Sequence, residues 1–268
     1  MSLLRVKSLI VGTPIEGIVT SLRWYLGFVN RFRFPEMCEA YLEERRLPAV
    51  LRKLLPRRDA NCVDVGCHIG SFLNLLVRMF PEGRHVAIEA SPRKAAWLQN
   101  KFLGAVIHNV AVAAVPGTAT YEDNLRLPGY SRLVNTGDRG EGNSYYDVNV
   151  TTLDDLLLTK IDLLKIDIEG GELSALKGAT KTIAGSRPII LFEVGSEYAL
   201  EKIHVSRREL YDLLTEHLGY SIYTFTDILF DKEAMEFGEF RKCGTWPFRA
   251  FNFVAKPGSG EQIIGSHG

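Results

Sequence analysis

The sequence has few cysteines, no long hydrophobic run and no excess of either charge. Lys plus Arg, 32 residues, equals Asp plus Glu, 32 residues, so the formal net charge is +0 and no basic surface for nucleic acid is expected. The four cysteines are too scattered for a disulfide framework, and no two have the CxxC spacing of a zinc site. This pattern indicates reduced thiols in a cytoplasmic protein. The cysteines are Cys38, Cys62, Cys67 and Cys243.

No stretch of the sequence reaches transmembrane length. The apolar run near the N-terminus is broken by Lys7 and stopped by Gly12 and Pro14, which leaves it too short for a signal-peptide core. Residues 15–34 are rich in Leu, Trp, Tyr and Phe but carry charged residues among them. This segment predicts a helix that packs on the core or on a partner, and peripheral contact with a membrane stays open.

The composition is that of a globular protein with a full core. Hydrophobic residues make up 46% of the chain and charged residues 24%. The pattern predicts an N-terminal helical extension over residues 1–58, a main domain over residues 59–256 and a disordered tail over residues 257–268. The extension could form a lid, a face for a homo-oligomer or a membrane contact, and the sequence does not choose among these roles.

From Asn61 onward, strand patterns alternate with helix patterns. A strand, a glycine turn and an amphipathic helix come first, and a helix over residues 91–102 has Ser91 as its N-cap with Pro92 at the first helical position. Such alternation predicts an α/β fold with a mostly parallel sheet covered by helices on both faces. The expected strands are residues 62–66, 85–90, 105–112, 161–167, 187–194, 220–227 and 249–257, and further helices are expected over residues 172–183 and 206–219.

The middle of the chain is less regular. Residues 116–124 predict an edge strand or hairpin, and residues 127–146 form a polar, glycine-rich stretch that predicts a long loop. A short strand is expected over residues 147–150, and "TTLDDLL", residues 151–157, predicts the capped start of a helix.

Glycines after the first strand indicate a ligand-binding turn. In "VDVGCHIGS", Asp64 lies on the strand and Gly66 and Gly70 follow it, while the helix that starts at Ser71 offers free N–H groups. The next strand ends in Glu89, 19 residues after Gly70. An acid at this place can accept hydrogen bonds from the two ribose hydroxyls of an adenosine-containing cofactor.

The absence of a GxGxxG motif counts against NAD as that cofactor. A carboxylate at Asp64 would repel a pyrophosphate, but it suits a cofactor that carries an ammonium and a sulfonium group. The turn therefore favours S-adenosylmethionine.

The stretch "LLKIDIEGGE", residues 163–172, is unusual for a buried strand. A central parallel strand should be almost continuously aliphatic, yet period two places Lys165, Asp167 and Glu169 on one side. These groups either form a structural ion pair, Lys165 with Asp167, or face a cleft. The cleft is favoured because four expected strands carry acids near their carboxyl ends, where open α/β sheets bind ligands. Those acids are Asp64, Glu89, Asp167 and Glu193.

Several of these motifs together resemble the FkbM-type methyltransferases, which belong to the class I S-adenosylmethionine-dependent superfamily. The resemblance rests on "DVGCHIGSF", "AIEASP", "HNVAVAAVPGTAT", "TTLDDLL", "IDLLKIDIEGGELSALKGA" and "PIILFE", and it covers about residues 60–195. It implies a doubly wound, Rossmann-like sheet of seven strands with the last strand antiparallel. It also implies O-methylation of a hydroxyl on a sugar, glycan or other secondary metabolite.

The resemblance also implies roles for individual residues. The residues near the methionine end of the cofactor would be Asp64, Gly66, His68 and Gly70, with Ser71 at the helix start behind them. The residues near the nucleoside would be Glu89 at the ribose and Asn109 and Val110 at the adenine. The residues that face methyl transfer would be Asp167 and Glu169.

A base that removes the acceptor proton would help the transfer, because an alcohol is a poor nucleophile until that proton leaves. Asp167 is the first candidate and His68 an alternative. In another alternative, Asp167 holds a divalent cation such as Mg²⁺ with the help of Glu169 or Glu193.

Other classes of function stay open beside the methyltransferase. A non-enzymatic module could keep an adenosine-binding fold, and an NAD-dependent enzyme could share the topology. An N-methyltransferase is the nearest enzymatic rival, but "DIEG" follows the fourth main strand where "NPPY" or "DPPY" is typical of amino methylation.

Overall fold

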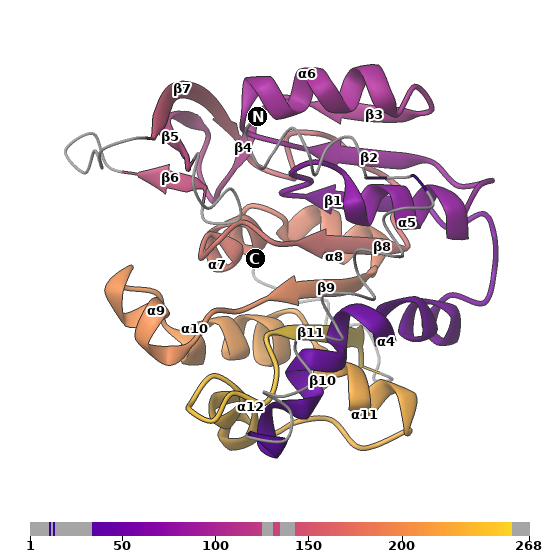
Figure 1. Cartoon of the computed structure of the whole chain (residues 1–268), viewed down its shortest axis with the longest axis vertical. Coiled ribbons are helices and arrows are strands. Elements are labelled where there is room, and N and C mark those ends of the chain that lie inside the picture. Colours follow the sequence, from indigo (N-terminus) through magenta and orange to yellow (C-terminus); the bar gives the residue numbers. More distant parts are fainter. Residues whose placement is uncertain (1–10, 12, 14–33, 125–130, 135–142, 259–268) are drawn as a thin grey trace, which may run out of the picture.

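The computed structural model describes residues 11, 13, 34–124, 131–134 and 143–258, and its main layer is a seven-stranded sheet (Figure 1). The strand order is β10-β11-β9-β8-β1-β2-β3. All neighbours are parallel except β11, which is antiparallel to both β9 and β10. The predicted mostly parallel seven-stranded sheet is confirmed. Its strands are β1 (Cys62–Val65), β2 (His85–Ile88), β3 (Ala105–His108), β8 (Leu163–Ile166), β9 (Ile189–Glu193), β10 (Tyr220–Thr224) and β11 (Asn252–Pro257).

Helices cover both faces of this sheet, because its strands are apolar on both sides. Along β8, Leu164 packs in one buried cluster with residues of α7, α8, α10 and α12. Its neighbour Leu163 packs in a second cluster with residues of α4, α5 and α11. The helices are α4 (Cys38–Leu54), α5 (Ser71–Met79), α6 (Pro92–Lys101), α7 (Glu172–Lys177), α8 (Thr180–Ser186), α9 (Glu197–Lys202), α10 (Arg207–Asp212), α11 (Phe225–Leu229) and α12 (Phe237–Cys243), with a 3-10 turn at η1 (Pro35–Met37) and a π-helical turn at η3 (Leu213–His217).

The register of the central strands aligns their carboxyl ends. Val65 on β1 pairs with Ile88 on β2 and with Ile166 on β8. The residues that follow these three strands therefore meet at one edge of the sheet, which includes Glu89 and Asp167.

Helix α4 is fixed to the main domain. Val50 and Leu51 are fully buried in the second cluster. The Glu43 carboxylate accepts hydrogen bonds from the backbone N–H groups of Phe251 and Asn252, at the start of β11, at 2.9 and 3.1 Å. Residues 15–33 of the predicted extension and residues 259–268 of the predicted tail lie outside the described residues, so the boundaries at 58 and 256 stay predictions.

A second sheet of four strands lies beside the main one; the strands expected over residues 116–124 and 147–150 are part of it, but a separate sheet was not predicted. Its order is β4-β7-β5-β6, formed by β4 (Ala111–Val112), β5 (Gly117–Asp123), β6 (Arg132–Val134) and β7 (Ser144–Thr151). The prediction of one long loop over residues 127–146 is wrong, since β6 and the start of β7 fall within it; residues 127–130 and 135–142 of that stretch lie outside the described residues. Backbone pairing with β5 stabilises both strands despite their polar sequence.

Further expectations need correction. The strand expected over residues 105–112 is divided into β3 of the main sheet and β4 of the second sheet, and the strand expected over residues 220–227 ends at Thr224, directly before α11. Residues 151–157 do not start a helix: residues 153–157 form turns, in which the Asp154 carboxylate accepts hydrogen bonds from the N–H groups of Lys181 and Thr182 in α8. The helix expected over residues 172–183 is divided into α7 and α8 around Gly178, where a Cβ atom would lie 2.2 Å from the Ala113 carbonyl oxygen. Within the described parts of the chain, no helix has the length and apolarity needed to cross a membrane.

Candidate active site

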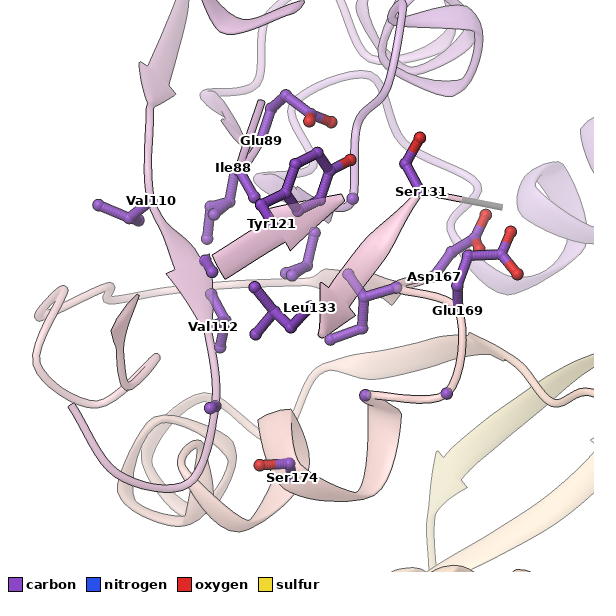
Figure 2. A pocket seen from close by; sticks show the side chains of 18 of the residues that line it. Ile88, Glu89, Val110, Val112, Tyr121, Ser131, Leu133, Asp167, Glu169 and Ser174 are labelled. Atoms are coloured by element: carbon purple, nitrogen blue, oxygen red, sulfur yellow. The ribbon is translucent and has the colours of Figure 1, made fainter. Parts of the chain in front are cut away.

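A cavity of about 430 Å³ opens at the carboxyl edge of the main sheet (Figure 2). This volume lies within the roughly 300–1,000 Å³ of typical small-molecule sites. Its walls come from the turns after β1, β2, β3 and β8, from α7 and from the second sheet. The main lining residues are Gly66, His68, Ile88, Glu89, Lys94, Val110, Val112, Tyr121, Ser131, Leu133, Asp167, Ile168, Glu169, Ser174, Ile203 and Val205.

The turn after β1 passes directly beside the end of β8. Gly66 has a φ of 83°, in the left-handed region, and a Cβ atom there would lie 1.9 Å from the carbonyl oxygen of Asp167. Only glycine fits this backbone contact. The glycine loop that the sequence predicted as a ligand turn therefore also has a structural reason.

Glu89 follows β2 and is buried in the cavity wall, with 3% of its surface exposed. Its two carboxylate oxygens accept hydrogen bonds from the backbone N–H groups of His68 and Ser91, each at 2.8 Å. Burial raises the pKa of Glu89, although Lys94 and these two N–H groups oppose the rise. A carboxylate has about four lone-pair sites, so Glu89 is held in place and can still accept hydrogen bonds from two hydroxyls.

At the end of β8, the charged side chains form the predicted ion pair and also face the predicted cleft. The ion pair is formed, with Lys165 Nζ 2.8 Å from Asp167 Oδ2 and 3.6 Å from Asp64 Oδ1. Burial lowers the pKa of Lys165, but the two carboxylates raise it by more, so the ammonium form is favoured. Asp167 also lines the cavity, as the cleft reading predicted.

The other two acids of this stretch have separate roles. Glu172 is buried, and its Oε1 accepts hydrogen bonds from the N–H groups of Ile168 and Gly170 at 3.0 and 3.2 Å, which holds the turn. Glu169 has a φ of 53° and lines the cavity. Burial, together with the nearby carboxylates of Asp167 and Glu172, raises the pKa of Glu169 to about 7.

The cavity wall brings together six of the ten residues expected at the site: Gly66, His68, Glu89, Val110, Asp167 and Glu169. The other four lie outside it. Asp64 is fully buried beside Lys165, and Ser71 is exposed at the start of α5. Gly70 is the N-cap of α5, and the Asn109 amide donates hydrogen bonds to the backbone carbonyls of Glu89 and Ala90.

Burial raises the pKa of Glu193, at the end of β9, to about 8, with further contributions from Asp167 and Glu169. No group of three or more His, Cys, Asp or Glu side chains in the described ranges is placed to hold a metal ion. The predicted Mg²⁺ at Asp167, Glu169 and Glu193 therefore gains no support from this geometry.

Sequence reasoning missed Lys94 and Tyr121, which line the cavity near Glu89, and considered Ser131 only as a loop residue that could contact the acceptor. No motif marks these residues, and Tyr121 lies on the second sheet. Only the structure shows that this sheet reaches the cofactor edge.

One protein family matches the part of the chain that carries the cavity. The profile of the family described as Methyltransferase FkbM domain matches residues 64–222, which run from Asp64 on β1 to Ile222 on β10. The chain belongs to the FkbM methyltransferase family. The resemblance stated from the sequence motifs is thereby confirmed, as is the prediction of an S-adenosylmethionine-dependent methyltransferase at the level of the family.

The chain is also similar to a curated methyltransferase. Methyltransferase sdnD of Sordaria araneosa is 31% identical over 153 residues, which cover 43% of this chain and 59% of that protein. The chain thus spans about three fifths of the length of that relative.

Solved methyltransferase structures resemble the FkbM domain more distantly. Methyltransferase FkbM from Methylobacillus flagellatus KT is 20% identical with a TM-score of 0.46, covering 74% of this chain and 44% of that chain. Fibrillarin from Aeropyrum pernix, solved with natively bound S-adenosyl-L-methionine, is 13% identical with a TM-score of 0.42, covering 79% of this chain and 73% of that chain.

The residues of the cavity fit S-adenosylmethionine. Glu89 presents a fixed acceptor for ribose hydroxyls at the end of β2, and Val110 offers an apolar contact after β3. Asp167 and Glu169 supply negative charge after β8, which suits a cofactor with a sulfonium and an ammonium group.

Proposed function

We propose that this chain transfers a methyl group from S-adenosylmethionine to a hydroxyl of a small acceptor. One observation carries the proposal: Glu89 after β2 and the acids Asp167 and Glu169 after β8 line the same cavity. In this proposal, Glu89 is the ribose acceptor and an acid after β8 is the base at the other end of the site.

Glu89 and Val110 would hold the nucleoside, and the turn at Gly66 and His68 would lie against the methionine end. When bound, S-adenosylmethionine supplies an activated methyl group. The protein then has to orient an acceptor oxygen, exclude water and remove a proton.

Glu169 is the better candidate for the base, although the sequence favoured Asp167. The Asp167 carboxylate is already engaged in an ion pair with the Lys165 ammonium at 2.8 Å, which leaves Glu169 as the acid of this turn without such a partner among the ion pairs of the described residues. Glu169 has a pKa of about 7, and a base is most effective when its pKa lies near the working pH. His68 lies in the same wall and is the alternative.

A sugar, glycan or other secondary metabolite is the proposed acceptor class. Oxygen is favoured over nitrogen because Asp167, Ile168, Glu169 and Gly170 follow β8 where an amino-methylating enzyme typically has "NPPY" or "DPPY". N-methylation of a small molecule is the second candidate, and a module that only binds the cofactor is the third.

A labelling experiment separates these candidates. The purified protein is incubated with S-adenosylmethionine carrying a ¹³C-methyl group and with a small-molecule extract of the cells that make the protein. The carbon chemical shift of the labelled product distinguishes a methyl on oxygen from a methyl on nitrogen. Loss of the product with Glu169→Gln, but not with Glu201→Gln on the exposed face of α9, supports the assigned base. A methyl on nitrogen contradicts the choice of oxygen, and binding of the cofactor without any product favours the binding module.

A further inference from the structure

A buried polar network joins α6 to the second sheet at the wall of the cavity. Lys94 is 2% exposed, and its Nζ lies 3.4 Å from Tyr121 Oη, 3.3 Å from Ser131 Oγ and 3.3 Å from Asp123 Oδ1. Asp123 is fully buried and also accepts a hydrogen bond from Arg93 at 2.7 Å. The network therefore connects one helix with strand β5 and with the residue just before β6.

The charges make this junction rigid. Lys94 is the buried cation that opposes the charges of both Asp123 and Glu89. Breaking a buried charge pair by removing one partner is costly, because the other charge is left without compensation. These contacts thus attach the second sheet to α6 beside the cofactor edge of the main sheet.

Tyr121 projects from this sheet to the cavity. Its ring is 7% exposed and packs in a cluster with Ala111 and Val148, with Ala90 at its border. Figure 2 shows Tyr121 close to Ile88 and Glu89. On the neighbouring strand β6, Leu133 lines the same wall and is 37% exposed.

The cavity has two ends, and Tyr121 lies at the end near Ile88 and Glu89. Ile88 and Glu89 lie at the end of β2, and Val110 follows β3, whereas Glu169 follows β8. Strand β1 separates β8 from β2 in the sheet. The second sheet therefore covers the end of the cavity where the ribose acceptor lies.

We propose that the second sheet is the roof of the nucleoside subsite, where Tyr121 and Leu133 contact the adenosine part of the cofactor and Lys94 positions them. This inference rests on the proposed function, since it assumes that the cavity binds an S-adenosyl compound. An aromatic ring is a favourable partner for a purine base, because both present flat, polarisable faces.

Equilibrium dialysis with labelled S-adenosylhomocysteine tests the roof. Tyr121→Ala should weaken binding by about tenfold or more, as loss of an aromatic contact to a base does. Tyr121→Phe keeps the ring and should change the affinity by no more than about twofold. Tyr145→Ala is the matched control: this tyrosine lies on β7 of the same sheet and donates a hydrogen bond to Glu122 at 2.9 Å instead of lining the cavity.

Unlabelled adenosine, used as a competitor, identifies the contacted part. It lacks the amino-acid portion, so its affinity should fall by the same factor in Tyr121→Ala if the ring contacts the nucleoside. A loss for S-adenosylhomocysteine with unchanged adenosine binding contradicts the nucleoside assignment. If Tyr121→Ala does not fold by circular dichroism, Leu133→Ala replaces it, because Leu133 is partly exposed and should weaken binding about threefold.

Lys94 is tested as a positioning residue. Lys94→Met should weaken S-adenosylhomocysteine, and Lys94→Arg should restore part of the affinity, because the charge toward Asp123 returns. Failure of the inference and failure of the proposed function remain distinct. Unchanged affinity in the Tyr121 and Leu133 variants, with normal binding by the wild type, overturns only the roof. A folded wild type that binds no S-adenosylhomocysteine overturns the proposed function itself.

Discussion

Lys165 Nζ lies 2.8 Å from Asp167 Oδ2 and 3.6 Å from Asp64 Oδ1, so that one cation pairs with a carboxylate on β1 and with another directly after β8. Asp64 is fully buried on β1, and Asp167 stands at the cavity directly after β8. The pair thereby connects the interior of the sheet with the site.

Replacing Lys165 with Met should destabilise the protein by about 3–5 kcal/mol, because two acids then lose their shared cation inside the fold. Urea unfolding at neutral pH measures this change. Lys177→Met is the matched control, since Lys177 pairs with Glu209 on the surface and should cost at most about 1 kcal/mol. Equal losses in the two variants would mean that the buried ion pair adds nothing.

If Glu169 is the base, methyl transfer should rise with pH around its pKa of about 7 and then level off, because only the carboxylate can accept the proton. Glu169→Gln should lower the rate by about 10²–10⁴-fold at high pH. Single-turnover rates from about pH 5 to about pH 9, with the acceptor found by labelling, give the profile. A profile of Glu169→Gln that keeps the wild-type rate and inflection would assign the base elsewhere.

The same residue should make the fold less stable at alkaline pH. Burial raises the pKa of Glu169 from 4.5 to about 7, so its ionisation opposes folding. The stability that the neutral Glu169 carboxyl contributes is fully present below pH 4.5 and is lost as the pH rises through about 7. Because Glu169 is exposed at the cavity, solvent screening weakens this effect, and Glu169→Gln should gain at most about 1 kcal/mol relative to the wild type at pH 8. Chemical unfolding of both proteins at about pH 5 and about pH 8 tests it. A difference that does not depend on pH would contradict the raised pKa.

Gly66→Ala should disrupt the site and the fold together. The new Cβ atom would lie 1.9 Å from the Asp167 carbonyl, and the φ of 83° is unfavourable for alanine. We expect a loss of at least about 2 kcal/mol in thermal unfolding and weaker binding of S-adenosylhomocysteine. Gly104→Ala provides the comparison, because no atom lies within 4 Å of a Cβ there. A Gly66 variant as stable as the Gly104 variant would show that the turn after β1 can move away from the turn after β8 without loss of stability.

The main sheet was predictable because its strands are apolar on both sides and end in glycines or acids. Ser91 serves as the N-cap of α6, as its position before Pro92 predicted. Local patterns of this kind depend on neighbours in the chain, which a sequence displays directly.

Strands over residues 116–124 and 147–150 were predictable, but their assembly into a second sheet was not, because that sheet depends on pairing between distant segments. Strand β6 has three residues and lies in a polar stretch, yet it pairs with β5 from Thr120 to Glu122. The short helix expected at residues 151–157 failed for a related reason. The Asp154 carboxylate accepts hydrogen bonds from backbone N–H groups of α8, which is distant in the sequence.

Site residues that directly follow a strand were predictable from the sequence. Site residues whose position depends on tertiary contacts were not. Glu89, Asp167 and Glu169 lie in the cavity wall, as their positions after β2 and β8 implied. Asn109 was expected at the adenine, but its side chain holds the backbone after β2. The buried Lys94 became visible only when α6 and the second sheet were placed together.

Isothermal titration with S-adenosylhomocysteine measures whether this cavity binds an S-adenosyl cofactor through Glu89. We predict measurable binding by the wild type, at least tenfold weaker binding by Glu89→Ala (about 1.4 kcal/mol or more) and unchanged binding by Glu82→Ala, whose side chain is exposed near the start of β2. A folded wild type without heat of binding, or a Glu89→Ala variant with wild-type affinity, would contradict the account.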